Sequence, residues 1–251
     1  MNTTPAAAAS VPGRLTAVDV HVWTIAVTTD AASGLRPYLS PEEEDEAVRF
    51  RQPADSERHI VAHGALRLIL ASYVALDPRS LRFTIAAKGK PALVREAAMP
   101  DIRFNLAHSG AMILCAVANA REVGIDIERV DEAFDFDPVA SLSFSLAERA
   151  ALTRLPAQDR RGAFFAGWTR KEAYLKGFGE GLGYPLAAFD VSLAPGAAAA
   201  LLGSRLDADA PRHWFLCDLA VEPGYAAALA VERCGSGVIV HRRDFQRDIR
   251  L

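Results

Sequence analysis

The sequence predicts an α+β fold in which two similar halves, each built of helices and strands, enclose a cleft. In the first half, a helical pattern over residues 55–75 comes before three strand patterns. In the second half, helical patterns over residues 145–155 and 159–176 again come before strand patterns. Two halves of this kind would meet near residues 119–123 and form a cleft between them. With 51% hydrophobic residues, the 251-residue chain can build a sizeable core.

The charge and the cysteines argue against several classes of protein. A formal net charge of -3 and a pI near 6.1 disfavour a general nucleic-acid binder, which is normally basic. The three cysteines, Cys115, Cys217 and Cys234, are odd in number and far apart, so we expect neither a disulfide framework nor a zinc knuckle. The expected compartment is therefore the reduced cytoplasm.

We expect no export signal and no membrane span. Residues 1–12 lack a basic start, and the alanine run at residues 6–9 is far too short for a secretory core. No stretch reaches the about 18 uninterrupted apolar residues that a membrane span needs. Residues 1–14 are expected to form a loose tail.

The first half should begin with a strand and a short helix. Residues 16–28 alternate valines with polar residues and predict a strand, with His21 at its surface or edge. Ser40 followed by Pro41 predicts a helix start, with acidic residues in the first turn.

The longer helix over residues 55–75 carries His59 and His63 one turn apart. No glutamate accompanies them as in zinc-binding helices, so we expect an ordinary helix surface there and no metal site. The strands expected next in the chain cover residues 81–86, 102–106 and 112–118. In the second half, strands are expected over residues 189–193, 213–221 and 225–232.

Two loops beside these strands are candidates for binding an anion. Lys88 and Lys90 flank a glycine in a loop, where they either meet a phosphate or remain solvated lysines. His108 comes just after a strand, together with Ser109 and Gly110. Its imidazole and the nearby backbone N–H groups could hold an oxyanion.

Residues 123–128 predict a strand with two acids on one face. Three aliphatic residues alternate with Gly124, Asp126 and Glu128, so the aliphatic side chains would be buried and both carboxylates would share the other face. By itself, such a pair is more typical of a solvated strand edge. Two carboxylates held close together repel each other, and a hard cation such as Mg²⁺ is the usual way to neutralise that repulsion.

A second group of candidates lies on the helix over residues 159–176. Trp168, Glu172 and Lys176 are spaced i, i+4, i+8, which places them along one side of the helix. An isolated Glu–Lys pair is usually an ordinary surface pair. An ordinary surface pair does not explain the glycines that follow, which allow sharp turns or a close approach to a ligand: Gly177, Gly179, Gly181 and Gly183.

Together these segments resemble a known family. Gly-Ile-Asp-Ile-Glu at residues 124–128, followed by Trp-x-x-Lys-Glu-Ala-x-x-Lys at residues 168–176, resembles the paired signature of the phosphopantetheinyl transferases. The match is to the larger Sfp type, which acts on carrier domains of peptide and polyketide synthases. Phe-Asn-Leu-Ala-His-Ser-Gly at residues 104–110 and Gly-Lys-Pro at residues 89–91 are similar to further family segments. The resemblance covers about residues 40–232.

The resemblance implies a pseudo-twofold pair of α+β halves with the active site in the cleft between them. We assign residues 15–119 and 120–251 to the two halves, with the metal site in the second. The implied metal is Mg²⁺, held by Asp126, Glu128 and Glu172. The implied co-substrate is coenzyme A, and the candidate contact residues are Arg51, Arg58, Lys88, Gly89, Lys90, Pro91, His108, Ser109, Asp126 and Lys176.

The chain departs from the family pattern in two places. Ala107 replaces the serine that is usual there, so one hydroxyl contact is missing. Residues 42–46 are all acidic, whereas the corresponding family helix often carries basic residues that meet the 3'-phosphate of coenzyme A. We expect Arg49 or Arg51 to supply that contact instead.

The implied activity is transfer of 4'-phosphopantetheine from coenzyme A to a serine of an apo acyl or peptidyl carrier protein. The candidate catalytic residues are Glu172, as base or holding a water that is the base, Lys176, which would stabilise or protonate the leaving phosphate, and His108. A noncatalytic carrier-binding or coenzyme-A-binding relative and a Mg²⁺-dependent phosphohydrolase remain alternatives. We expect a monomer without nucleic-acid or membrane partners, with carrier contacts among Arg149, Arg154, Arg160 and Arg161.

Overall fold

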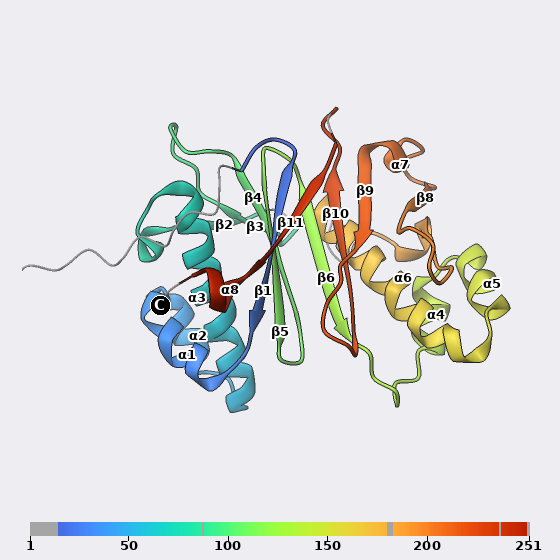
Figure 1. Cartoon of the computed structure of the whole chain (residues 1–251), viewed down its shortest axis with the longest axis horizontal. Helices are drawn as coiled ribbons and strands as arrows, with labels where there is room; N and C mark the ends of the chain where they lie inside the picture. Colours follow the sequence, from blue (N-terminus) through green and yellow to red (C-terminus); the bar gives the residue numbers. More distant parts are fainter. Residues whose placement is uncertain (1–14, 87, 180–182, 236, 250–251) are drawn as a thin grey trace, which may run out of the picture.

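The structure is a computed structural model that describes residues 15–86, 88–179, 183–235 and 237–249. The expected tail at residues 1–14 and Gly181 of the glycine series lie outside the described residues. Strands occupy the middle of the molecule, with helices α1, α2, α3 and α8 (residues 29–74 and 245–248) on one side and helices α4, α5, α6 and α7 (residues 137–213) on the other (Figure 1). The fold is therefore α+β, as predicted.

The strands form two main sheets and two small ones. The first sheet has the order β11-β1-β5-β4 and contains β1 (Asp19–Ala26), β4 (Ile102–Ser109), β5 (Met112–Asn119) and β11 (Ile239–Asp244). The second sheet has the order β6-β10-β9 and contains β6 (Val123–Arg129), β9 (Trp214–Asp218) and β10 (Tyr225–Glu232). The small sheets pair β2 (Phe83–Ile85) with β3 (Pro91–Leu93), and β7 (Phe189–Val191) with β8 (Leu201–Ser204). All of these pairs are antiparallel except β1 with β11, which is parallel.

Two long helices cover the main sheets. They are α3 (Pro53–Val74) and α6 (Ala157–Phe178). The shorter α-helices are α1 (Thr29–Leu35), α2 (Pro41–Ala47), α4 (Asp137–Ser143), α5 (Leu146–Arg154), α7 (Ala210–His213) and α8 (Phe245–Asp248). Short 3-10 turns are η1 (Arg36–Tyr38), η2 (Pro78–Ser80) and η4 (Leu186–Ala188). Within the described ranges, no helix combines the length and the apolar composition that crossing a membrane requires.

Alternating side chains arrange these elements in four layers. On β1, Trp23 and Ile25 belong to the core under α3, whereas Val20 and Val22 point to the other face of the sheet. That other face packs against the aliphatic side of β6 and β10 in the second sheet. The opposite side of the second sheet lies under α6. The layers are therefore helix, sheet, sheet and helix.

The two main sheets meet along β4 and β6. Backbone N–H groups of β6 bond to side chains of β4 there, and the two strands share no backbone ladder. The backbone N–H of Ile125 donates to Asn105 Oδ1 at 2.8 Å. Farther along, the N–H of Arg129 donates to Ser109 Oγ at 2.9 Å. These two bonds satisfy two backbone N–H groups at the edge of β6. They also fix how far β6 is shifted along its own direction relative to β4.

Several expected elements are confirmed. Strands β1, β4, β5, β9 and β10, and helices α3, α5 and α6, lie where the sequence patterns predicted them. Ser40 caps α2 in a full capping box with Glu43, which confirms the expected helix start.

The expectation for His21 is wrong. His21 is 3% exposed, because β1 lies between β11 and β5 and is not an edge strand. Its Nδ1 lies 2.7 Å from the hydroxyl of Tyr73 on α3. The burial lowers the pKa of His21 to about 4, and the positive charges of Arg243 and His241 act in the same direction.

The division into residues 15–119 and 120–251 stays a prediction, but the last elements of the second range lie with the first sheet. Strand β11 pairs with β1, and Phe245 of α8 is buried in the core under α3. The chain therefore crosses to the second sheet after β5 and returns after β10.

Candidate active site

Glycine allows α6 to lie directly against β6. A Cβ at Gly124 would be 2.1 Å from the carbonyl oxygen of Ala173 and 2.1 Å from the amide nitrogen of Gly177. No larger residue fits there without moving the helix, so Gly124 sets the distance between strand and helix. This contact brings the acids of β6 next to the polar side of α6.

Asp126 is the most buried of the predicted metal ligands. Its side chain is 5% exposed, and its Oδ1 accepts a hydrogen bond from Lys176 Nζ at 2.6 Å. Burial raises the pKa of Asp126 to about 7, against the opposing effect of Lys176, and the charges of Glu128 and Glu172 raise it further. These mutual effects place the three carboxylates in one electrostatic site, on the face of β6 that the alternation predicted.

Glu128 and Glu172 border the same site from β6 and α6. Glu128 Oε2 accepts a hydrogen bond from Ser109 Oγ at 3.0 Å, so the bridge between β4 and β6 also orients this carboxylate. Burial raises the pKa of Glu172, and the charge of Glu128 acts in the same direction while Lys176 opposes it.

The residues present fit a hard divalent cation. In the part of the chain that the structure describes, no three acidic, histidine or cysteine side chains are already arranged around a metal position. However, Asp126 Oδ2 is buried and has no hydrogen-bond partner among the described residues. Carboxylate oxygens are the donors that Mg²⁺ prefers, and this unpaired oxygen belongs to a carboxylate whose pKa is raised by the charges of Glu128 and Glu172.

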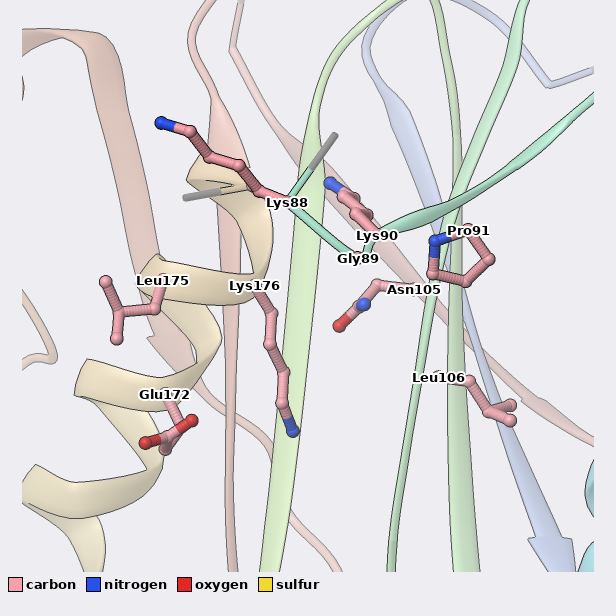
Figure 2. Close-up of a pocket in the computed structure, with 10 residues that line it drawn as sticks. Lys88, Gly89, Lys90, Pro91, Asn105, Leu106, Glu172, Leu175 and Lys176 are labelled. Carbon is pink, nitrogen blue, oxygen red and sulfur yellow. The ribbon is translucent and has the colours of Figure 1, made fainter. Parts of the chain in front are cut away.

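A pocket of about 240 Å³ opens beside this site, between the loop before β3, strand β4 and helix α6 (Figure 2). It brings together six of the predicted site residues, and Figure 2 shows Glu172 and Lys176 on one helix across from the loop residues. The lining residues are Lys88, Gly89, Lys90, Pro91, Asn105, Leu106, Glu172, Leu175, Lys176 and Gly179.

Four of these lining residues were not among the predicted site residues, although Gly179 belongs to the glycine series that could allow a close approach to a ligand. Leu175 lies one turn from Glu172 on α6, so helical spacing could have identified it, whereas Gly179 caps the end of that helix. Asn105 and Leu106 lie within the family-like segment on β4, but no sequence signal distinguished their roles.

Lys90 contributes to the pocket wall while its ammonium group binds protein atoms. Lys90 Nζ donates to Glu122 Oε2 at 2.7 Å, to the Val123 carbonyl at 3.1 Å and to the Gly177 carbonyl at 3.0 Å. Burial lowers its pKa, although Glu122 opposes that change.

His108 lies at the end of the site where Arg58 and Lys176 act on it. Its outer edge is exposed, but the partial desolvation of its ring lowers its pKa, and the charges of Arg58 and Lys176 lower the pKa further. Arg58 forms an ion pair with Asp55 at the start of α3. The lowered pKa favours a neutral imidazole at His108, next to two cationic side chains that could stabilise an anion.

Arg51 is not among the residues that line the pocket. It is exposed in the turn before α3, as is Arg49 just after α2. The acidic run at residues 42–46 has a structural role instead. Glu43 pairs with Arg67 of α3 at 2.6 Å, and Glu44 pairs with Arg36.

Lys171, next to Glu172 in the helical motif, is fully buried. Its Nζ pairs with Glu148 Oε2 at 2.8 Å and donates to the carbonyls of Leu186 and Phe189. It therefore anchors α6 to α5 and β7, on the side of the helix away from the three acids.

Comparison with known proteins finds matches over most of the chain. A family model described as the 4'-phosphopantetheinyl transferase superfamily matches residues 122–230, and a model described as 4'-phosphopantetheinyl transferase, N-terminal, matches residues 28–120. The 4'-phosphopantetheinyl transferase HetI of Nostoc sp. is 34% identical over 219 residues, which cover 86% of this chain and 89% of that protein. The 4'-phosphopantetheinyl transferase Sfp of Bacillus subtilis is 30% identical over 156 residues, covering 62% of this chain and 67% of that protein. A solved structure described as the Chronobacterium ammoniagenes ACPS-CoA complex is 23% identical with a TM-score of 0.33, covering 45% of this chain and 97% of that chain.

Proposed function

The chain belongs to the 4'-phosphopantetheinyl transferase superfamily, in which it is an Sfp-type transferase that modifies carrier proteins, and we propose that it uses coenzyme A and Mg²⁺ at the site between β6 and α6. The observation that carries the proposal is the joint position of Asp126, Glu128, Glu172 and Lys176 beside a pocket. Phosphoryl transfer uses carboxylates to bind the metal ion and a cationic group, here an ammonium, to stabilise the phosphate.

Asp126, Glu128 and Glu172 would hold the metal. The buried, unpaired Oδ2 of Asp126 supports this assignment, as do the raised pKa values of Asp126 and Glu172. When bound, Mg²⁺ would offset the negative charge of the pyrophosphate and so favour attack by a hydroxyl group.

Coenzyme A would place its phosphates among the cations of the site. Arg58, Lys88 and His108 would contact these groups from the first half, and Lys176 from the second. Gly89 and Pro91, with the stem of Lys90, would form the wall of the pocket, and Ser109 would orient Glu128. We assign the 3'-phosphate to Arg51, whose exposed position before α3 leaves room for a flexible contact.

In the reaction, the serine hydroxyl of an apo carrier protein attacks the β-phosphorus of coenzyme A. The new bond joins the serine oxygen to that phosphorus, and the bond to the oxygen of the leaving 3',5'-ADP breaks. Glu172, or a water that it holds, takes the hydroxyl proton from the attacking serine. Lys176 stabilises the leaving phosphate, with His108 beside it.

We propose a cytoplasmic monomer, since both halves of the one chain contribute residues to the pocket. The carrier would approach the second half. Of the four candidate arginines, Arg154 is exposed, whereas Arg160 and Arg161 donate to backbone carbonyls. We therefore propose Arg154 as the first residue to test for carrier contact, and the half-buried Arg149 as the second.

The test is intact-mass spectrometry of an apo carrier domain incubated with the protein, coenzyme A and Mg²⁺. We expect a mass gain of one phosphopantetheine that is absent when a chelator is added. Free phosphate or free phosphopantetheine without a modified carrier would indicate hydrolysis. No product with carriers from several pathways would indicate a binding protein and contradict the proposal.

Glu172→Gln should abolish transfer, because it removes both the proton acceptor and a metal ligand. The matched control is Asp159→Asn in the first turn of the same helix. Transfer by Glu172→Gln at the wild-type rate would refute both roles.

A further inference from the structure

The ammonium group of Lys90 has three donors, and all three bind the protein itself. Its acceptors are Glu122 Oε2, the Val123 carbonyl and the Gly177 carbonyl, at distances of 2.7 to 3.1 Å. An ammonium has three N–H donors and no acceptor, so these bonds use its full capacity. The Lys90 side chain is 15% exposed, which leaves little of it open to a ligand.

The three acceptors lie on or next to the two elements that carry the catalytic groups. Val123 is the first residue of β6 and Glu122 directly precedes it, so they lie three and four residues before Asp126. Gly177 lies in the last turn of α6, next to Lys176. Lys90 itself comes from the loop before β3 in the first half. One side chain thus connects the first half to both sides of the site.

The end of α6 is a place where a cation stabilises the helix. Carbonyls in the last turn lack helical partners, and the C-terminus of a helix carries partial negative charge. The helix ends at Gly179 with φ +76, and a Cβ at that position would lie 3.7 Å from Lys90 Cδ. The stem of Lys90 therefore packs beside the capping residue Gly179, while its ammonium binds the Gly177 carbonyl in the last turn of the helix.

We propose that Lys90 is a positioning residue that holds the last turn of α6 against the start of β6, and that it is not a phosphate ligand. It acts on the reaction through Lys176, whose ammonium must stay within reach of both Asp126 and the leaving phosphate. The expected change in kcat rests on the proposed function. The expected effect on the packing of α6 against β6 does not.

Lys90→Met removes the ammonium and keeps a stem of similar length. We expect kcat to fall by about 10- to 100-fold, since a small misplacement of a catalytic group has an effect of that size. The KM and the Kd for coenzyme A should change by no more than about twofold, because no phosphate contact is lost. A large rise in KM with kcat preserved would overturn the proposal and make Lys90 a ligand.

Two variants serve as matched controls. Lys88→Met alters the exposed lysine at the other side of Gly89 and should raise the KM for coenzyme A, the opposite pattern. Arg103→Met removes another partner of Glu122 without touching α6, and should leave kcat within about twofold because its ion pairs are partly open to solvent and hold no group of the site. An equal fall in kcat for Arg103→Met and Lys90→Met would overturn the role of the contact with Gly177.

Hydrogen exchange measures the structural consequence without any activity. In Lys90→Met, amides at the end of α6, residues 175–179, should exchange faster than in the wild type, whereas those at the end of α3 should not change. If Lys90→Met does not fold, Glu122→Gln is the second variant. It weakens the bond between Lys90 and residue 122 and should speed amide exchange in the same turn of α6. Unchanged exchange there overturns the inference, whereas absence of transfer by the wild type contradicts only the proposed function.

Discussion

Asp126 keeps its carboxyl group where its charge is disfavoured. Its pKa rises from the ordinary 3.8 to about 7, first because of burial and then because of Glu128 and Glu172. A raised pKa means that the stability contributed by this group is complete below pH 3.8 and is lost as the pH rises through about 7. The folded protein thus gives up stability at neutral pH in order to keep a carboxylate at the site.

Asp126→Asn, which is neutral at every pH, should therefore be more stable than the wild type at pH 8, by about 1 kcal/mol or more in metal-free protein. At pH 4 the difference should be small. Urea unfolding at the two pH values measures it, and a less stable variant at pH 8 would contradict the assignment. Adding Mg²⁺ at pH 8 should raise the Tm of the wild type but not of the variant.

Gly124→Ala tests the close contact between β6 and α6. The added methyl group would lie 2.1 Å from two backbone atoms of the helix, so either strand or helix must move. We expect a loss of about 1–3 kcal/mol or more in the free energy of unfolding, together with reduced transfer. Gly203→Ala is the control, because nothing lies within 4 Å of a Cβ there. Equal stability of both variants would show that the helix does not depend on this contact.

Among the helices, α2 is attached to α3 through Glu43. Burial acts to raise the pKa of Glu43, but hydrogen bonds from His63, Arg67 and the Ser40 backbone outweigh it and lower the pKa to about 2. A lowered pKa means that this stability is present above the ordinary 4.5 and is lost as the pH falls through about 2.

Glu43→Gln should consequently lower the free energy of unfolding at pH 7 by about 3 kcal/mol, because it leaves the buried Arg67 without its charged partner. The difference from the wild type should shrink as the pH is lowered from 4 toward 2. The exposed Asp45→Asn on the same helix should show neither effect. Acid titration of the unfolding midpoint distinguishes the two variants.

Periodicity predicted the elements that bury a regular apolar pattern. The strand with Asp126 and Glu128 and the helix with Glu172 and Lys176 are where the alternation and the i, i+4 spacing required them. Elements without such a pattern were missed. Half of the residues of strand β11 are charged, and its position depends on pairing with β1, more than 200 residues earlier in the chain.

Residue roles were harder to predict than elements because they depend on distant partners. His21 has the polarity of a surface residue, yet a tyrosine hydroxyl on α3 allows its burial. The acids at residues 42–46 gave no sign that Glu43 would meet Arg67. The Gly-Lys-Pro segment indicated a phosphate site, but spacing alone could not show that the Lys90 ammonium contacts β6 and α6.

At the scale of the whole molecule, the C-terminal segment completes the first core. Phe245→Ala should cost about 3–5 kcal/mol, because the ring is 1% exposed beneath β1 and α3. The exposed Arg247→Ala, two residues later, should leave the unfolding midpoint unchanged. Thermal unfolding measures both, and similar midpoints for the two variants would mean that the segment does not contribute to the core.

The junction between β4 and β6 has a consequence for protein engineering. The backbone ladders stay within their own sheets, and the chain passes from one to the other through the short turn after β5. Cutting that turn would therefore interrupt no ladder between the two sheets, while β11 of the second piece would still add itself to β1 of the first. A cut that spares the buried Arg121 and the Lys90 partner Glu122 would therefore divide the chain into two complementing fragments. Their reassembly would restore the site and report contact between two proteins fused to the fragments.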